Sequence, residues 1–121
     1  MNAESGEGGQ ASVELALVLP VLVMLLLAIV QTALVARDAV LVQDAARAAA
    51  REASVGSSSS RVRDAARRAL PGVDVDVRRT GGVGDPVVVV AHYHDRTTVP
   101  LIGPLFPDVD LRAQATMRAE E

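Results

Sequence analysis

The sequence predicts an α+β fold: a long N-terminal transmembrane helix that continues into a soluble helix, a second short helix, and a three-stranded antiparallel sheet. Three observations predict this class. An apolar block near the N-terminus is long enough to span a bilayer. An alanine- and arginine-rich segment without Gly or Pro extends its helical pattern. Three later segments alternate apolar and polar residues, as half-buried strands do.

The apolar block is uninterrupted from Leu15 to Val30 and resumes after Gln31 and Thr32. Counted from residue 15 to 36, a helix is about 33 Å long at ~1.5 Å per residue, enough to cross the hydrocarbon core of a bilayer. Backbone groups in lipid must be satisfied internally, so this segment should be helical. We assign a transmembrane helix to residues 10–36.

Two features lie at the start of this helix. Pro20 removes one backbone donor, so we expect it to kink the helix. Residues 1–9 are small, polar and glycine-rich, and we expect them to be a disordered leader.

The helical pattern continues over residues 37–54, and Gly56 with the serines after it should end it. A second helix is predicted over 59–70, where one arc is apolar and Pro71-Gly72 stops it. The apolar positions on that arc are Val62, Ala65, Ala66, Ala69 and Leu70.

The period then changes from that of a helix to two. We expect strands at about 73–79, 87–98 and 108–118, of which the last alternates most regularly. Three short strands with one apolar face need a cover, and the helices before them can supply it. Residues 37–121 are therefore predicted to form one small extracytoplasmic α+β domain.

The segment between the second and third strands contains three prolines and is too broken for a strand. Its apolar side chains can either fold back on the small core or be exposed to a partner or the membrane surface. The residues of this candidate partner loop are Leu101, Ile102, Leu105 and Phe106.

Composition excludes several classes of function. The chain has 121 residues and no cysteine, so it has no disulfide and no thiolate metal site. Residues 37–121 carry twelve arginines and twelve acidic residues, unlike the basic surface of a nucleic-acid binder. No nucleophile–base set or phosphate-binding loop is visible. We expect no enzyme activity, no cofactor and no small-molecule substrate.

His92 and His94 fall on one face of the second predicted strand. Two imidazoles can bind zinc, but a site needs three or four ligands, and no third ligand is signalled. Exposed polar side chains are the simpler interpretation, so we predict no metal and leave the role of the two histidines open. The pairs Asp74/Asp76 and Asp108/Asp110 also fit the solvated face of a strand.

The most informative stretch is Gly9-Gln10-Ala11-Ser12-Val13-Glu14-Leu15-Ala16-Leu17-Val18-Leu19-Pro20. A glycine precedes the apolar run, and a single carboxylate lies inside its start. This arrangement resembles type IV prepilins. The resemblance implies cleavage between Gly9 and Gln10 by a prepilin peptidase, which makes Glu14 the fifth mature residue. It also implies that Glu14 pairs with the free amine of an adjacent subunit during assembly.

Three segments narrow the resemblance to one family of prepilin-like proteins. They are SVELALVLPVLVMLLLAIV, the predicted helix VQDAARAAARE and the C-terminal ATMRAE. Together these segments resemble the TadE-like proteins, pseudopilins of the tight-adherence (Tad, Flp-type) pilus machinery, with a pilin-like architecture. The resemblance implies a structural, membrane-anchored component of pilus assembly or secretion, in contact with the cytoplasmic membrane, a prepilin peptidase and other pilin-like subunits. The subunit contacts would run through the N-terminal helix.

Localisation follows from the same resemblance: a single pass through a bacterial cytoplasmic membrane, with residues 37–121 outside. The acidic leader and Arg37 favour the opposite orientation on the positive-inside rule alone. The alternative function is a signal-anchored extracytoplasmic binding module unrelated to pili, in which Glu14 would be incidental.

Overall fold

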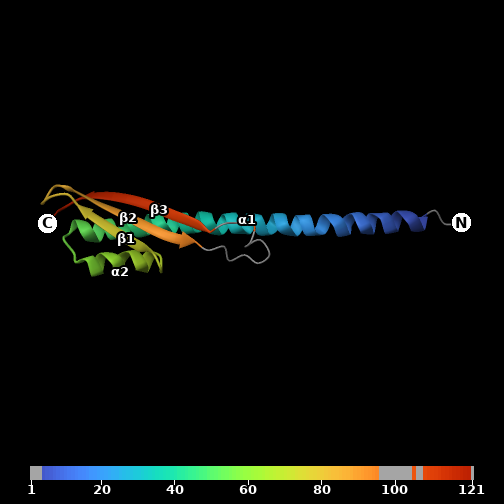
Figure 1. Ribbon diagram of the computed structural model, residues 1–121, viewed down its shortest axis with the longest axis horizontal. Coiled ribbons are helices and arrows are strands. Elements are labelled where there is room, and N and C mark those ends of the chain that lie inside the picture. The colour runs from blue at the N-terminus through green and yellow to red at the C-terminus, as the bar shows by residue number, and fades with distance from the viewer. Residues whose placement is uncertain (1–3, 96–104, 106–107, 121) are drawn as a thin grey trace.

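The computed structural model describes residues 4–95, 105 and 108–120 of the chain. It contains helices α1 (Glu4–Ser54) and α2 (Ser59–Ala69) and strands β1 (Asp74–Arg79), β2 (Pro86–Asp95) and β3 (Val109–Arg118). Figure 1 shows α1 as a long rod, with α2 and the sheet packed around its C-terminal part. The predicted fold class, a long apolar helix followed by a short helix and a three-stranded antiparallel sheet, is confirmed.

Helix α1 is 51 residues long and passes Pro20 without a break. The predicted kink is not seen, because the ribbon in Figure 1 is nearly straight. A proline inside a helix costs one backbone hydrogen bond. Here the flanking turns consist of uninterrupted helix-compatible apolar residues, and they continue the helix on both sides.

The N-terminal end of α1 differs from the expected disordered leader, because residues 4–9 are helical. Once a helix is nucleated, each further residue adds one backbone hydrogen bond, so the long apolar helix can extend into a weakly helical sequence. Residues 6–9 are exposed. A Cβ atom added at Gly6, Gly8 or Gly9 would meet nothing within 4 Å, so these three positions face open space.

The three strands form one antiparallel sheet in the order β1-β2-β3. Opposite pairs include Val77 with Val89 and Val89 with Ala115, so the odd-numbered apolar residues share one face. That face covers α1, whereas the even-numbered residues of β3 are exposed. Along β3, from Val109 to Arg118, buried or half-buried residues alternate with exposed ones, as the sequence pattern of the third strand predicts.

The core lies between the C-terminal half of α1, the inner face of the sheet and α2. Its α1 side is formed by small residues that are almost fully buried: Val42, Ala45, Ala46, Ala49, Ala50 and Ala53. Valines from α2, from β2 and from the turn before β1 complete it, namely Val62, Val87, Val89 and Val73. Alanine lets neighbouring elements approach closely, so the chain packs a dense core with few large side chains.

Helix α2 packs beside α1 through the predicted arc. Val62, Ala66 and Leu70 are buried, and Ala65 and Ala69 are half-buried. The chain turns sharply at Gly56 and Gly72, which have φ values of 75° and 84°, where glycine avoids the clash of a Cβ atom. These turns fold α2 and then β1 back along α1.

The C-terminal end of the chain is tied to the far end of α1. The Glu120 amide donates to the Ser54 carbonyl at 2.8 Å, and the Ala119 amide donates to the Asp85 carbonyl at 2.8 Å. These bonds close the domain at the end farthest from the apolar half of α1 (Figure 1).

Most of the candidate partner loop, with Leu101, Ile102 and Phe106, lies outside the described residues, as do residues 96–98 of the second predicted strand. Leu105 is described and is 67% exposed.

Candidate functional site

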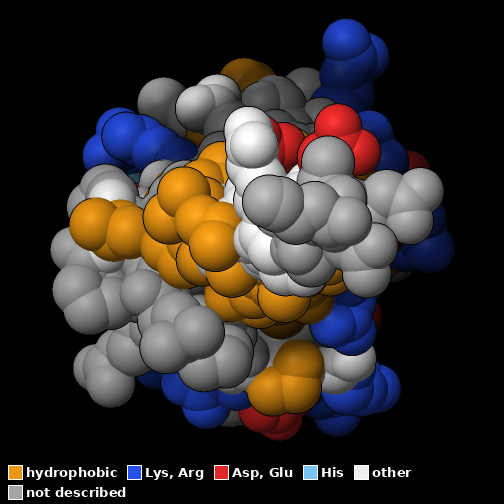
Figure 2. Space-filling view, turned by 90° about the vertical axis from the view of Figure 1, so that its right-hand side faces the viewer, with side chains coloured by type: hydrophobic (Ala, Val, Ile, Leu, Met, Phe, Trp, Pro, Cys, Tyr) orange, Lys and Arg blue, Asp and Glu red, His pale blue; other side chains and the backbone are white. Residues whose placement is uncertain are grey.

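The N-terminal half of α1 carries large apolar side chains that contact no other described element. Leu17 is 69% exposed, Val21 67% and Leu26 60%. An 18-residue window of this helix has a mean hydropathy of 2.9 and is not covered by the rest of the protein. Figure 2, seen along α1 from its N-terminal end, shows hydrophobic side chains gathered near the centre and arginines towards the rim. A single N-terminal apolar helix of this kind fits membrane anchoring.

Glu14 lies on α1 just before this exposed apolar surface. The Gln10 side-chain amide donates a hydrogen bond to its Oε1 at 3.3 Å, one helical turn away. Ser12 Oγ donates to the Gly8 carbonyl at 2.9 Å, so this hydroxyl is satisfied within the helix as well. The second carboxylate oxygen of Glu14 remains available for a partner outside the helix, and the surrounding side chains are exposed.

The model of the TadE-like protein family matches residues 9–51. Residues 9–51 are TadE-like. The match begins at Gly9 and includes Gln10, Glu14 and Pro20, so the predicted family resemblance is confirmed for the segment that carries the candidate site residues. The cleavage position, the assembly role of Glu14 and the partner loop remain predictions.

The TadE-like segment ends at Arg51, close to the end of α1. Helix α2 and the sheet, including the ATMRAE strand used in the resemblance, lie beyond it. No curated protein and no solved structure matches the chain. The TadE-like assignment thus rests on the helix that provides both the apolar surface and one wall of the domain core.

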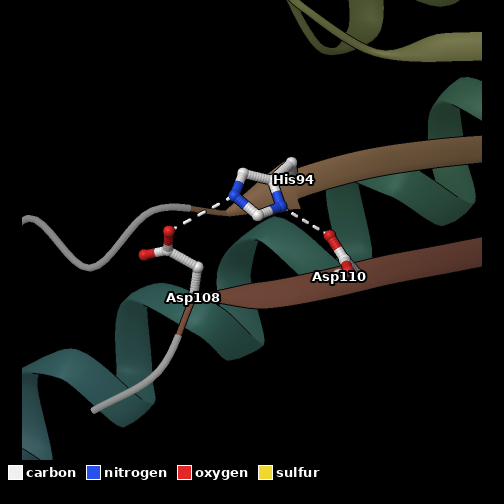
Figure 3. A network of polar contacts seen from close by, with 3 residues as sticks. All are labelled: His94, Asp108 and Asp110. Carbon is white, nitrogen blue, oxygen red and sulfur yellow. Dashed lines mark hydrogen bonds and ion pairs between the residues drawn. The ribbon is translucent and has the colours of Figure 1, made fainter. Parts of the chain in front are cut away.

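A second polar cluster lies on the outer face of the sheet, at the end nearer the apolar half of α1. His94 at the end of β2 points between Asp108 and Asp110 (Figure 3). Its Nδ1 lies 2.5 Å from Asp110 Oδ1, and its Nε2 lies 3.3 Å from Asp108 Oδ2. His92 Nε2 lies 3.7 Å from Asp76 Oδ2 on the neighbouring strand. The two histidines do share one face, as predicted, and each pairs with acidic residues.

The hydrogen bond to Asp110 is the main cause that raises the pKa of His94, with a smaller contribution from Asp108. A histidine whose folded-state pKa is raised stabilises the fold below its unfolded pKa. That contribution is lost as the pH rises through the folded-state pKa. The side chains are solvent-exposed, so the effect is screened.

In the described part of the chain, no group of three or more His, Cys, Asp or Glu side chains is arranged so that it could hold a metal ion. The contacts of His94 link the end of β2 to Asp110 of β3 and to Asp108 just before it. Both aspartates were predicted to be exposed polar residues. The register of the hairpin places Asp110 opposite His94, whereas Asp108 lies just before β3 and reaches the other ring nitrogen.

The structure adds a polar pocket between α1 and the end of β2 that sequence patterns alone did not indicate. Asp95, the last residue of β2, is only 8% exposed, and Gln31 of α1 is 4% exposed. Both line a pocket of about 300 Å³ against α1, together with Asp38 and Arg37. Burial is the main cause that raises the pKa of Asp95, and the nearby Asp38 carboxyl raises it further.

In the sequence, the one feature that pointed to this pocket is Gln31, a polar residue that interrupts the apolar block. Asp38 and Asp95 are 57 positions apart, and they meet only because the inner face of β2 packs on α1. Glu14 lies on the N-terminal side of this pocket on α1, so the candidate assembly residue and the polar end of the sheet form separate sites.

Proposed function

We propose that this protein is a TadE-like pseudopilin: a membrane-anchored, non-catalytic structural component of tight-adherence (Flp-type) pilus assembly or secretion. The observation that supports this proposal most directly is the match of the TadE-like family model to residues 9–51. These residues lie in α1, the helix whose apolar side chains are exposed. In this proposal α1 packs laterally against other pilin-like subunits within the membrane. The β-sheet domain is the part presented outside the cytoplasmic membrane.

The geometry of α1 supports a packing role. Exposed apolar residues occupy all sides of the helix between Val13 and Val23, so neighbours or lipid can cover any face of this stretch. Glu14 is the one charged residue within residues 13–30. A carboxylate in the bilayer costs roughly 2.5–3.5 kcal/mol on insertion scales unless it finds a partner. A free amine created by cleavage between Gly9 and Gln10 on an adjacent subunit would be a suitable partner.

Photo-crosslinking in cells tests lateral packing. A benzophenone amino acid in place of Leu22, which is 51% exposed, is expected to crosslink to other pilin-like subunits or to a second copy when the pilus machinery is expressed. The same probe at Ser59, exposed at the start of α2, serves as the control for the soluble domain and is expected to give at least several-fold less of these products.

The alternative, a signal-anchored binding module unrelated to pili, predicts a different pattern. In that case the probe at Leu22 would capture lipid only. A crosslinking profile from Leu22 that does not change when the other pilus components are deleted would contradict the pseudopilin proposal.

A further inference from the structure

Helix α2 carries a band of arginines on the side that faces away from the core. Its apolar positions, such as Val62 and Ala66, are buried in the core. The outward side is exposed and holds four arginines and one aspartate, namely Arg61, Arg63, Asp64, Arg67 and Arg68. We call these residues the arginine face of α2.

The positive charge of this face is not neutralised within the described part of the chain. Arg63 and Arg68 donate through Nε to the carbonyl oxygens of Ser59 and Asp64 in their own helix. Among the described residues, none of the arginines of α2 forms a salt bridge with an acidic side chain. The arginine face is therefore suited to a partner that carries negative charge.

A surface of the opposite charge lies on the outer face of this protein's own sheet, at the end nearer the apolar half of α1. It exposes four aspartates and one arginine, namely Asp74, Asp76, Asp108, Asp110 and Arg112. The strand register places Asp74, His92 and Arg112 in one row across the sheet. We call the five residues the acidic sheet end. His92 and His94 contact its aspartates, and even with His94 protonated the acidic groups remain in excess.

The bilayer surface is a poorer match for the arginine face. Helix α1 extends about 27 Å from Ala36, the end of the predicted span, to Ser54 at ~1.5 Å per residue. Helix α2 folds back from that end over 11 residues, or about 16 Å, so even its last turn lies about 10 Å beyond the span (Figure 1). The acidic sheet end is the part of the domain nearer the span, and its aspartates repel anionic headgroups.

The arrangement of the two surfaces allows one copy of the chain to meet another. Both surfaces lie along the side of α1 and not at its tips (Figure 1). A second copy can turn about the axis of α1 and present its acidic sheet end to the arginine face of the first, while the two α1 helices still point in the same direction. Two copies that are anchored in one membrane require this shared direction.

We propose that the arginine face of α2, centred on Arg67 and Arg68, docks on the acidic sheet end of a second copy of this chain. The contact joins two different surfaces, so each copy keeps one surface free for the next and a row of copies can grow. The start of α2 at Ser59 lies about 12 Å from Arg67 along the helix and outside the contact. The inference rests on the proposed function, because it assumes subunits side by side in one membrane.

Thiol crosslinking tests the contact, because the chain has no cysteine of its own. Two differently tagged copies of the full chain are reconstituted together in phosphatidylcholine bilayers, one with Pro71→Cys and one with Gln114→Cys, and a short bismaleimide is added. Both positions are exposed and uncharged. Pro71 follows Arg67 by four residues, and Gln114 lies two residues after Arg112 on the same sheet face. Replacing the first variant with Ala39→Cys, an exposed position on α1, measures the background.

We expect a mixed dimer from the Pro71→Cys and Gln114→Cys copies at a yield several-fold above this background. Reversing the charges of the first copy with Arg67→Glu and Arg68→Glu should lower the yield at least several-fold. Reversing the acidic sheet end of the second copy as well, with Asp74→Arg and Asp76→Arg, should restore it. Because the restored pair carries four substitutions, a variant that merely misfolds cannot produce this result.

The matched control reverses two arginines outside the arginine face. Arg78 and Arg118 are exposed at the other end of the outer sheet face. Arg78→Glu with Arg118→Glu in the Gln114→Cys copy changes the net charge by the same amount as the reversal on α2. We expect this control to leave the yield of mixed dimer undiminished.

Three results would overturn the proposed contact. The first is a yield that does not fall on reversal of the arginine face, or that is not restored by the second reversal. The second is a yield that falls several-fold when phosphatidylglycerol is added to the bilayer, because the arginines would then bind lipid headgroups. The third is background crosslinking in cells where the Leu22 probe does capture neighbouring subunits, which would leave the pseudopilin proposal standing. A charge-dependent mixed dimer together with a Leu22 probe that captures lipid only would instead support the contact and contradict the pseudopilin proposal.

Discussion

Replacing Glu14 with glutamine is expected to leave the protein in the membrane but to reduce its incorporation into pilin-like assemblies by more than about tenfold. Glutamine keeps the size of the side chain and can still bond to Gln10, whose side-chain amide lies 3.3 Å from Glu14 Oε1. It lacks the negative charge that a neighbouring amine would neutralise. An ionic partner that offsets even half of an insertion cost of roughly 2.5–3.5 kcal/mol accounts for a tenfold change.

The matched control is Glu7→Gln. Glu7 has the same side chain and is also exposed on α1, but it precedes Gly9, so cleavage would remove it from the mature protein. Co-purification of the membrane-extracted protein with other pilin-like subunits measures both variants. Normal co-purification of Glu14→Gln, or an equal loss for Glu7→Gln, would show that Glu14 has no special role in assembly.

Replacing Ala49 with leucine is expected to destabilise the domain by about 1–3 kcal/mol, a large part of the stability of a small core. Ala49 has no exposed surface and lies in the alanine face of α1 that packs against the sheet and α2. Three added carbon atoms have no space there, so the strands or α2 must shift. Urea unfolding of the domain in detergent, followed by its β-sheet signal, measures the change.

Ala39→Leu is the control for this substitution because Ala39 is on the same helix and is exposed. Its expected effect is within about 0.5 kcal/mol, as for most surface changes. Equal unfolding midpoints for the two leucine variants would contradict the packing of the alanine face.

The order of elements could be predicted because each has a strong local signal. The apolar block has the length of a membrane span, and Val109 to Arg118 alternates without exception. The arc of α2 also follows from helical spacing, since Val62, Ala66 and Leu70 recur on one side and are buried. Such signals depend only on neighbours in sequence, so one chain is enough to reveal them.

Features that depend on packing could not be predicted in this way. Asp95 was placed inside a longer strand and had no distinguishing neighbour, yet the inner face of β2 buries it against α1. The partners of His94 depend on the β2–β3 register, in which His94 stands opposite Asp110. Register is set by the whole hairpin and by the helix beneath it.

The N-terminal residues illustrate another limit. Composition predicted a disordered leader at 1–9, whereas the helix begins at Glu4. The apolar segment behind it can propagate helix into residues with weak preferences of their own. The same continuity carries α1 through Pro20.

The mass of the mature protein tests the central claim most directly. The full chain would be purified from the membranes of cells with an active prepilin peptidase and analysed by intact-mass and N-terminal peptide mass spectrometry. A protein that begins at Gln10, shortened by the first nine residues, is the predicted result. A protein that retains residues 1–9 under these conditions would contradict the assignment of a prepilin-like assembly subunit.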